Sequence, residues 1–368
     1  MRVTRIDVYA YELSYVGGAY AMSGGRVVES LTSTVVRIVT DEGLEGFGET
    51  CPLGPAYLAA HAGGAQAALR ELAPAALGLD PREPCVVADR LDEALRGHEY
   101  AKSALDVACW DVAGRAAGVP VCVPLGGRRQ ASFPLYVAIP LGPVDTMVAD
   151  VERHRADGVH RFQLKLGADP HEDAARVRAV LEATDDEDVV IADANGGWRL
   201  TDAMTAARLL EGLPRLFFEQ PCPTLEECLS VRRHTSLPFV LDEVITDVES
   251  FLRAWREHGM DAINLKISKV GGLTRARTLR ELAESVGVSL TIEDTWGGDL
   301  VTAAVAHLAA TTRPETLLTV SFMNDWTREH LAGYEPRSAG GRGAAPAGPG
   351  LGVDVDVEAL GEPLFTVA

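Results

Sequence analysis

The sequence has few of the features of a secreted, zinc-thiolate or membrane protein. Only six cysteines occur in 368 residues, and they show neither the paired spacing of zinc sites nor the density of disulfide-rich domains. They are Cys51, Cys85, Cys109, Cys122, Cys222 and Cys228. The amino-terminal MRVTRIDVYAYEL lacks the apolar core of a signal peptide, and no apolar run reaches membrane-spanning length. We therefore expect a cytoplasmic protein with reduced thiols.

Positive charge is also scarce. The chain has 34 lysines and arginines against 53 aspartates and glutamates, a formal net charge of −19. Nucleic acids and acidic membrane surfaces are polyanions, so this balance argues against both as partners. With 368 residues, 47% of them hydrophobic, the chain can form a large barrel with an accessory domain or two ordinary domains.

The first third of the chain predicts an α+β unit that ends near residue 125. LTSTVVRIVTDEGLEGFGE is typical of a β-hairpin, and YAKSALDVACWDVAGRAAGVP places apolar residues at helical spacing before Gly118 and Pro120. Near the carboxyl end, the glycine- and proline-rich SAGGRGAAPAGPGLG predicts a loop. The alternation in VDVDVEALGEPLF that follows predicts a strand that returns to the first unit.

From about residue 130, short apolar strands alternate with helical stretches. Eight strands are expected, and their starts are 23 to 28 residues apart. They are LYVAI (135), RFQLKL (161), VVIAD (189), LFFEQ (216), FVLDE (239), AINLKI (262), SLTIED (289) and LLTVSF (317). This spacing predicts a closed (β/α)8 barrel. A doubly wound open sheet is the alternative, but no GxGxxG follows the first of these strands.

Charged residues stand at the ends of six predicted strands. Taken singly, each has a structural explanation: a turn residue, a helix cap or an ion-pair partner. In a parallel barrel, however, the carboxyl ends of the strands share one rim, where catalytic groups lie. The residues are Lys165, Asp193, Glu219, Asp242 with Glu243, Lys266, and Glu293 with Asp294.

Their order along the rim predicts a chemistry. Asp193, Glu219 and Asp242 end three consecutive strands and offer the hard oxygen ligands that suit Mg²⁺ and disfavour zinc. Lys165 and Lys266 end strands that are four apart in a ring of eight, so they face each other. Removal of an α-proton from a carboxylate substrate gives an enediolate, whose charge a divalent cation stabilises.

The two lysines are expected to divide the proton transfer between them. Burial and the nearby metal are expected to lower the pKa of lysine, so that one amine serves as the base and the other as the acid. Bases on opposite faces of the substrate also permit inversion at the α-carbon. A buried lysine in the apolar strand INLKI thus has a functional explanation.

Motifs along almost the whole chain resemble those of the enolase superfamily, specifically its muconate-lactonizing subgroup. The segments are SALDVACWDVAGRAAGVPVCVPLGG, QLKLG, DANGGW, EQP, LDE and INLKISKVGG. The resemblance implies a modified barrel, (β/α)7β, over residues 129–339. It also implies an α+β capping domain over residues 1–128, completed by residues 340–368. It assigns Mg²⁺ to Asp193, Glu219 and Asp242, and acid–base roles to Lys165 and Lys266.

One position departs from the subgroup. Gln163 stands where the first lysine of a KxK pair is usual, so one source of pKa depression on Lys165 is missing. Mandelate-type members use an Asp-His pair in place of the lysine on the sixth strand, and no histidine stands in such a place here.

Substrate specificity is expected from the loops around this rim. GGAYAMSGGR and CPLGPAYLAA are glycine-rich candidate lids, and EDTWGGDL follows the seventh strand. Aromatic and acidic side chains suit a cationic ammonium group, with cation–π attraction of about 0.5 to 2 kcal/mol per ring; simple packing of the rings is the alternative. The predicted substrate-binding residues are Tyr20, Tyr57, Gln163, Asn195, Asp294, Trp296 and Trp326.

Several reactions fit these observations. TIEDTWGGDL, CPLGPAYL and GHEYAKSALDVACWD resemble segments of 4-hydroxyproline betaine 2-epimerases and cis-3-hydroxy-L-proline dehydratases. The leading prediction is 2-epimerisation or racemisation of a proline-derived amino acid or betaine, ahead of cis-3-hydroxyproline dehydration and of N-acylamino acid or dipeptide epimerisation. A barrel that binds a ligand without turnover is the alternative, but the complete set of two lysines and three carboxylates at the strand ends argues against it: Lys165, Asp193, Glu219, Asp242 and Lys266. The expected partners are a zwitterionic or carboxylate small molecule and further copies of the chain.

Overall fold

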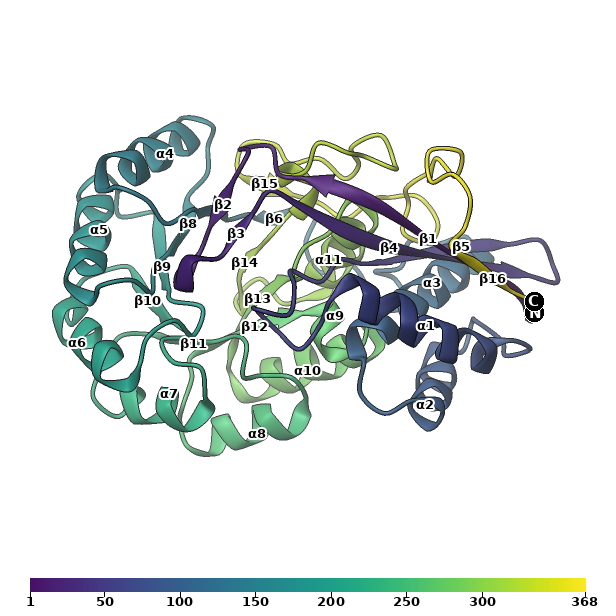
Figure 1. The fold of residues 1–368 in the computed structure, drawn as a ribbon, viewed down its shortest axis with the longest axis horizontal. Coiled ribbons are helices and arrows are strands. Elements are labelled where there is room, and N and C mark those ends of the chain that lie inside the picture. The colour runs from purple at the N-terminus through teal and green to yellow at the C-terminus, as the bar shows by residue number, and fades with distance from the viewer.

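The amino-terminal strands form an antiparallel sheet that packs against three helices (Figure 1). In the computed structural model, which describes residues 1–368, the sheet has the order β16-β1-β4-β5. Its strands are β1 (Val3–Ser14), β4 (Ser30–Thr40), β5 (Glu45–Thr50) and β16 (Phe365–Val367). The helices are α1 (Ala62–Ala76), α2 (Pro84–Ala94) and α3 (Glu99–Ala117). The predicted hairpin is present as β4 and β5, and the predicted helix as α3.

Helix α3 lies directly on β5, and glycine makes this approach possible. A Cβ atom on Gly48 would lie 2.0 Å from the carbonyl oxygen of Ala104 in α3, and one on Gly46 would lie 2.5 Å from that of Ala108. No larger side chain fits at either position. The helix ends at Gly118, which adopts the left-handed conformation that glycine favours.

The rest of the chain forms a parallel barrel. Its sheet has the order β14-β13-β12-β11-β10-β9-β8-β7, and a parallel bridge between Leu135 and Val320 joins its two edges. The strands are β7 (Val137–Ile139), β8 (Arg161–Lys165), β9 (Val189–Asp193), β10 (Leu216–Glu219), β11 (Phe239–Leu241), β12 (Ala262–Lys266), β13 (Ser289–Glu293) and β14 (Leu317–Val320). Each of the eight predicted strands is present within a few residues of its expected place.

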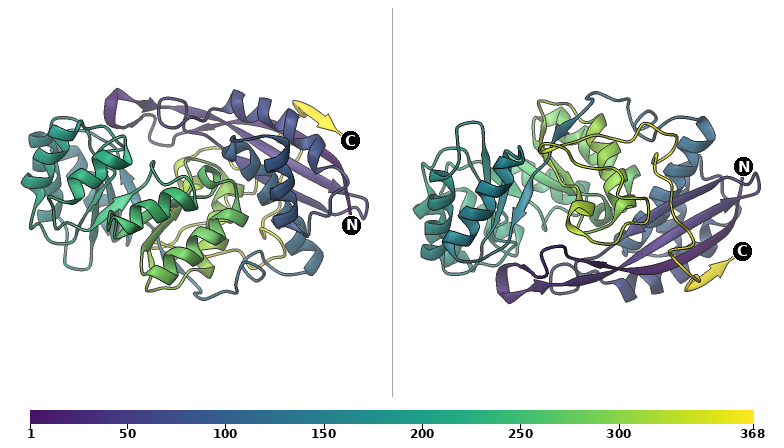
Figure 2. Two further views of the ribbon diagram at one scale, coloured as in Figure 1. Left: turned by 90° about the horizontal axis from the view of Figure 1, so that it is seen from below. Right: turned by 90° about the horizontal axis from the view of Figure 1, so that it is seen from above.

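Seven helical connections cover the outside of the barrel (Figures 1 and 2). They are α4 (Val144–Ala156), α5 (Pro170–Glu182), α6 (Leu200–Leu210), α7 (Leu225–Arg232), α8 (Val248–Arg256), the pair α9 (Ile267–Val270) and α10 (Leu273–Val286), and α11 (Asp299–Thr311). Strand β14 is followed by the short 3₁₀ helix η2 (Met323–Trp326) in place of an eighth α-helix. The predicted (β/α)7β barrel with an α+β cap is therefore confirmed. The boundaries at residues 128 and 339 stay a prediction.

A hairpin extends from the cap sheet toward the ends of the barrel strands (Figures 1 and 2). It contains β2 (Tyr20–Ala21), the 3₁₀ turn η1 (Ser23–Gly25) and β3 (Val27–Val28). A second small pair joins β6 (Phe133–Pro134) to β15 (Arg342–Gly343). The first hairpin contains the predicted lid GGAYAMSGGR, and we refer to residues 17–28 as the lid hairpin.

The carboxyl-terminal segment corrects one prediction. VDVDVEALGEPLF was expected to be a strand, but residues 353–363 form no strand. Its alternating valines pack instead on the barrel core, where Val353 is buried and Val355 and Val357 lie against it. The return to the cap comes later, because Phe365–Val367 pairs with β1 as β16.

All six cysteines are free thiols, and only Cys85 is exposed. None of the helices combines the length and hydropathy that crossing a bilayer requires.

His307 ties the carboxyl-terminal segment to α11 and makes a pH-dependent contribution to stability. Its buried ring accepts a hydrogen bond from the Cys122 N–H at 3.2 Å and donates one to the Leu351 oxygen at 3.0 Å, so the ring must be neutral. Burial lowers the pKa of His307 to about 4 from 6.5. As the pH falls from about 6.5 to about 4, the unfolded chain takes up a proton here and the folded chain does not.

Between pH 7 and pH 4.5, acid should therefore destabilise the protein through this residue by about 2 kcal/mol. Denaturant unfolding at pH 7 and pH 4.5 measures the effect. His307→Gln should lose less stability than the parent over this interval, although it is less stable at pH 7. An equal loss in both proteins would contradict the assignment.

Candidate active site

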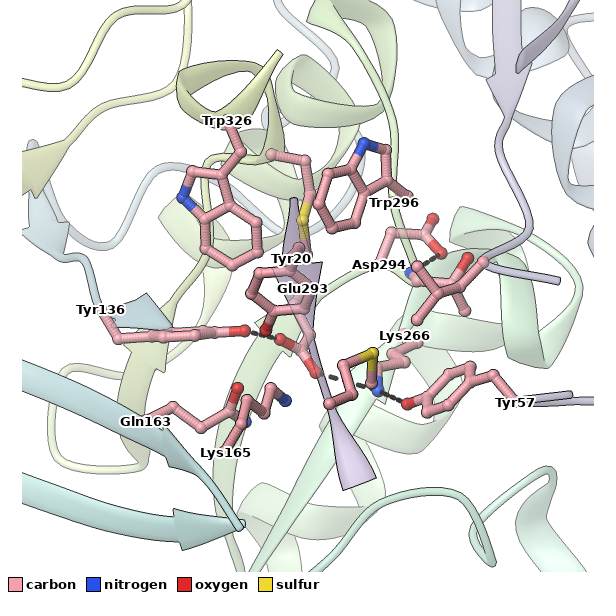
Figure 3. Close-up of a pocket in the computed structure, with 14 residues that line it drawn as sticks. Tyr20, Tyr57, Tyr136, Gln163, Lys165, Lys266, Glu293, Asp294, Trp296 and Trp326 are labelled. Atoms are coloured by element: carbon pink, nitrogen blue, oxygen red, sulfur yellow. Dashed lines mark hydrogen bonds and ion pairs between the residues drawn. The ribbon is translucent and has the colours of Figure 1, made fainter. Parts of the chain in front are cut away.

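A small cavity opens where the carboxyl ends of the barrel strands meet the lid hairpin (Figure 3). Its volume is about 30 Å³, room for little more than water. Eight of the residues predicted from the sequence line it: Tyr20, Tyr57, Gln163, Lys165, Lys266, Asp294, Trp296 and Trp326. The sequence did not single out the other lining residues as a binding surface: Met22, Leu53, Tyr136, Glu293, Thr295 and Met323.

Lys165 and Lys266 reach this cavity from opposite sides of the barrel. They are the last residues of β8 and β12, which are separated by three strands in either direction around the closed sheet. Both side chains are buried, with 6% and 5% of the residue exposed. The two amines are therefore largely shielded from bulk water and face one small cavity, as the strand order predicted.

The surroundings of the two lysines raise their pKa values, contrary to expectation. Burial alone would lower the pKa of Lys165, but the carboxylate of Asp193, 2.6 Å from its Nζ, outweighs burial and raises it. The pKa of Lys266 is likewise raised well above its ordinary value, against burial, by Asp242 and Glu293. The predicted depression rested on burial and on a bound cation, and in this structure the paired carboxylates dominate.

Three carboxylates continue the rim beside Lys165. In the parallel register, Lys165 pairs with Asp193 and Asp193 pairs with Glu219, while Asp242 directly follows β11. Glu219 Oε1 accepts hydrogen bonds from Gln163 at 3.0 Å and from Asn264 at 2.7 Å, but its buried Oε2 has no partner. Burial and the charges of Asp193 and Asp242 raise the pKa of Glu219 well above its ordinary value.

This arrangement fits a divalent cation. Glu219 keeps one buried oxygen without a partner beside two further carboxylates, and hard oxygen ligands of this kind match Mg²⁺. The side chains are not gathered around one point, since no three His, Cys, Asp or Glu residues form a ready ligand cluster. Lys165 and Lys266 hold Asp193 and Asp242 instead, so ligation requires these carboxylates to turn from the lysines.

Asp242 is the most heavily paired of the three carboxylates. Lys266 contacts its Oδ2, Lys269 donates to its Oδ1 at 2.9 Å, and the hydroxyl of Tyr57 donates to Oδ2 at 3.1 Å. Burial would raise the pKa of Asp242, but the two lysines hold it well below its ordinary value. Tyr57 comes from the second predicted lid, CPLGPAYLAA, so that segment contacts a proposed metal ligand, Asp242, and a proposed catalytic amine, Lys266.

Two predicted substrate-binding residues, Gln163 and Asn195, donate hydrogen bonds to carboxylates of the site. The Gln163 side chain lines the cavity and donates to Glu219. Asn195 does not line the cavity; its Nδ2 donates to Glu243 at 3.1 Å and its backbone N–H to Asp193 at 2.8 Å. Substrate contact by either residue stays a prediction.

Adjacent acids on β13 and after it have different surroundings. Glu293 faces Lys266 at 3.3 Å and accepts a hydrogen bond from the Tyr136 hydroxyl. Asp294 accepts from the backbone and hydroxyl of Ser268 and from the Thr295 N–H, so both of its oxygens are engaged. Burial raises the pKa of Asp294 to about 6. Both acids line the cavity, and Glu293 is the one that lies beside Lys266.

Aromatic rings close the other side of the cavity (Figure 3). The centroids of Trp296 and Trp326 are 5.6 Å apart, and Tyr20 lies 5.7 Å from Trp296 and 6.1 Å from Trp326. Tyr136 lies 6.2 Å from Trp326. Four rings and the Glu293 carboxylate thus form one wall, which we call the aromatic wall.

Comparison with known proteins identifies the family. Residues 20–126 match the model of the mandelate racemase/muconate lactonizing enzyme N-terminal domain, and residues 146–360 match the enolase C-terminal domain-like model. The cis-3-hydroxy-L-proline dehydratase of Roseibium aggregatum is 44% identical over 364 residues, 99% of each chain. The chain belongs to the enolase superfamily.

Further relatives agree with this membership. Muconate cycloisomerase 1 of Rhodococcus opacus is 31% identical over 89% of each chain. A crystal structure of an enolase superfamily member from Roseovarius nubinhibens, complexed with magnesium, superposes with a TM-score of 0.94 at 36% identity, covering 100% of this chain and 99% of that one. The similar proteins are isomerases and a dehydratase, so this enolase superfamily member is an enzyme of the isomerase or lyase class.

Sequence reasoning overlooked two polar residues of the cavity. Glu293 was noted at the end of the seventh predicted strand but received no role, because Asp294 beside it was favoured. Tyr136 precedes β7 and carries no charge, so it is not among the charged residues at the ends of strands.

Proposed function

We propose that the protein removes the α-proton of a proline-derived carboxylate substrate and that the resulting reaction is the dehydration of cis-3-hydroxy-L-proline. The observation that carries the proposal is the pair of buried amines, Lys165 and Lys266, on opposite sides of one small cavity. The dehydration is favoured over epimerisation because the relative that is 44% identical over 99% of both chains is named a cis-3-hydroxy-L-proline dehydratase.

The stereochemistry of cis-3-hydroxy-L-proline suits a site with one lysine amine on each face of the substrate ring. In a cis-3-hydroxyproline the hydroxyl and the carboxylate share one face of the ring, so the α-hydrogen lies on the other. One lysine, in its neutral amine form, accepts the α-proton, the electron pair of the C–H bond forms a C2–C3 double bond, and the C3–O bond breaks. The leaving hydroxide takes a proton from the opposite face, where the second lysine lies, and departs as water.

Three carboxylates would support this step by holding a cation. Mg²⁺ held by Asp193, Glu219 and Asp242 would supply stabilisation of the negative charge that develops on the substrate carboxylate. Gln163 and Asn264 fix Glu219, and Lys269 fixes Asp242, so these side chains keep the rim in place. Burial of the cavity excludes the water that would otherwise exchange protons with the amines.

The aromatic wall supports recognition of the ring nitrogen. A proline-derived substrate carries an ammonium group beside the α-carbon, and Glu293 and the faces of Tyr20, Trp296 and Trp326 attract a cation. The volume of about 30 Å³ favours a small ring over the longer substrates implied by N-acylamino acid or dipeptide epimerisation. Even a proline requires some opening of the cavity.

The second candidate is 2-epimerisation of a proline or hydroxyproline betaine. Amines on both faces of the α-carbon can remove a proton from one side and return one to the other. The aromatic wall also suits a quaternary nitrogen, which cannot donate a hydrogen bond. This candidate shares the first chemical step with the dehydration.

One experiment separates the two candidates. The purified protein is incubated with MgCl₂ in D₂O with cis-3-hydroxy-L-proline, trans-3-hydroxy-L-proline or 4-hydroxyproline betaine, and ¹H NMR follows each substrate. We expect the cis-3-hydroxy compound to be consumed with formation of an enamine, which becomes a cyclic imine as C3 gains a proton and the nitrogen loses one, and the trans isomer to be spared. Deuterium at C2 of the betaine without water loss would favour epimerisation. No consumption and no α-deuterium in any of them would refute the proposal.

Glu293→Gln provides a test of ammonium recognition. Loss of a charged hydrogen-bond acceptor is expected to raise KM about 10- to 100-fold, with a smaller change in kcat, because the amines remain. Steady-state kinetics of the parent and the variant measure this. The matched variant Asp294→Asn should mainly lower the melting temperature, since Asp294 binds backbone and hydroxyl groups of Ser268. An unchanged KM in Glu293→Gln would contradict the role of Glu293.

A further inference from the structure

The tip of the lid hairpin fits between two glycines of the barrel. Ser23 is fully buried at this tip, although Gly24 and Gly25 beside it are exposed. A Cβ atom on Gly167 would lie 2.6 Å from the Cβ of Ser23, and one on Gly197 would lie 2.7 Å from it. The space that receives Ser23 therefore exists only because both positions lack a side chain.

These glycines follow the strand ends that carry the proposed chemistry. Gly167 is two residues after Lys165, and Gly197 is four residues after Asp193. Ser23 thus docks on the loops that continue β8 and β9. Its neighbours Tyr20 and Met22 line the cavity, so docking of the tip places both side chains over it.

Arg26 fastens the same hairpin to two other segments. Its guanidinium donates to the carbonyl oxygen of Ala56 in the second lid at 3.0 Å, and to that of Asn195 in the barrel at 3.2 Å. It also donates to the Ser23 oxygen at 2.9 Å and contacts the Ser23 hydroxyl. One side chain thereby joins the lid hairpin, the second lid and the barrel.

The two residues outside the hairpin that accept hydrogen bonds from Arg26, Ala56 and Asn195, lie next to proposed site residues or bind them. Asn195 adopts the left-handed conformation, with φ of 46°, and its N–H binds Asp193. Ala56 precedes Tyr57, whose hydroxyl binds Asp242 and contacts Lys266. Opening of the lid hairpin therefore breaks contacts on both sides of the cavity at once.

We propose that Ser23 and Arg26 form a lock that holds the lid hairpin and the second lid closed over the cavity, and that its release admits the substrate. Ser23 supplies the fit to Gly167 and Gly197. Arg26 is a positioning residue that couples closure of the lid hairpin to the placement of Tyr57. A cavity of about 30 Å³ requires such a release for any organic substrate. The lock does not depend on which proline derivative is turned over.

Hydrogen–deuterium exchange of the full chain tests the lock without a substrate. In Ser23→Leu the larger side chain no longer fits between the glycines, and in Arg26→Gln the charged bridge is lost. The Met22 N–H, which binds the Arg26 oxygen at 2.9 Å, reports on the hairpin. We expect exchange in residues 20–28 to rise about tenfold or more in both variants, because hydrogen bonds to charged groups are among the stronger ones.

Two matched controls accompany these variants. Val27→Leu enlarges an exposed side chain in the same hairpin, and Arg82→Gln removes an arginine whose side chain pairs only with Asp80, in the cap. Neither should change exchange in residues 20–28. Parent-like exchange in both Ser23→Leu and Arg26→Gln would overturn the lock, as would equal acceleration in the controls.

Kinetics give a second, independent readout. With a substrate that the parent turns over, Arg26→Gln should lower kcat/KM about 10- to 100-fold, and Arg26→Lys should recover only part of this because lysine lacks the planar fork. If the parent turns over none of the proline derivatives, the proposed function fails. Exchange would then still decide the lock by itself.

Discussion

Replacing Lys266 by alanine is expected to lower turnover by about 10³-fold or more, because a positioned acid or base contributes about 10²- to 10⁴-fold. The fold should survive this change. Asp242 keeps its hydrogen bonds from Lys269 and Tyr57, and Glu293 keeps the one from Tyr136, so neither buried carboxylate is left without a partner. The measurement is ¹H NMR of substrate consumption in D₂O, with circular dichroism and a melting curve to verify the fold.

Lys102→Ala is the matched control for Lys266→Ala. Lys102 is also a buried lysine, 4% exposed, and its Nζ lies 2.8 Å from Asp92 and 3.2 Å from Glu99, in the cap. Its loss should lower the melting temperature and leave turnover per folded molecule unchanged. Parent-like activity in Lys266→Ala would remove Lys266 from the chemistry. Equal losses in both variants would show that a buried ion pair matters only for folding.

Glu219→Gln is expected to abolish stabilisation by Mg²⁺ and, without Mg²⁺, to make the protein more stable. The buried Oε2 has no partner and adds to the negative charge of Asp193 and Asp242. An amide removes this charge and can still accept from Gln163 and Asn264, so we expect a gain of about 1 to 3 kcal/mol. A ligand at 100 times its dissociation constant stabilises a protein by about 2.7 kcal/mol, and the variant should lose that increment.

Denaturant unfolding with and without MgCl₂, together with titration calorimetry, measures both effects. Glu243→Gln serves as the comparison. Glu243 is a neighbouring buried carboxylate with an unpaired Oε2, but it lies outside the proposed ligand set. The Glu243→Gln variant should retain Mg²⁺ binding. Full Mg²⁺ affinity in Glu219→Gln, or its loss only in Glu243→Gln, would require a different set of ligands.

The barrel could be predicted because its signals are local and repeated. Eight apolar strands at nearly constant spacing allow few topologies, and the strand-end rule then brings Lys165, Asp193, Glu219 and Lys266 to one rim. Lys165 and Lys266 line the same cavity for this reason, whereas Tyr20 and Tyr57 reach it from the two lids. These residues are far apart in the sequence, but successive strands are neighbours in the barrel sheet, so their ends lie close together.

Three features could not be predicted from local patterns. The sequence does not show which of two adjacent acids lies beside Lys266; in the structure it is Glu293, the last residue of β13. The alternation in residues 353–357 indicated a strand, but it reflects packing of valines on the barrel. The fit of Ser23 between Gly167 and Gly197 depends on the length and direction of the lid hairpin, which no local pattern specifies.

The pairing of β16 with β1 places a constraint on biosynthesis. Strand β1 begins at the third residue of the chain, whereas β16 comes after all eight barrel strands. While the ribosome is still translating the barrel, the outer edge of β1 has exposed backbone hydrogen-bonding groups and can pair with other nascent chains. The cap is completed only when residues 365–367 have emerged, so aggregation during synthesis is the hazard that this chain order creates.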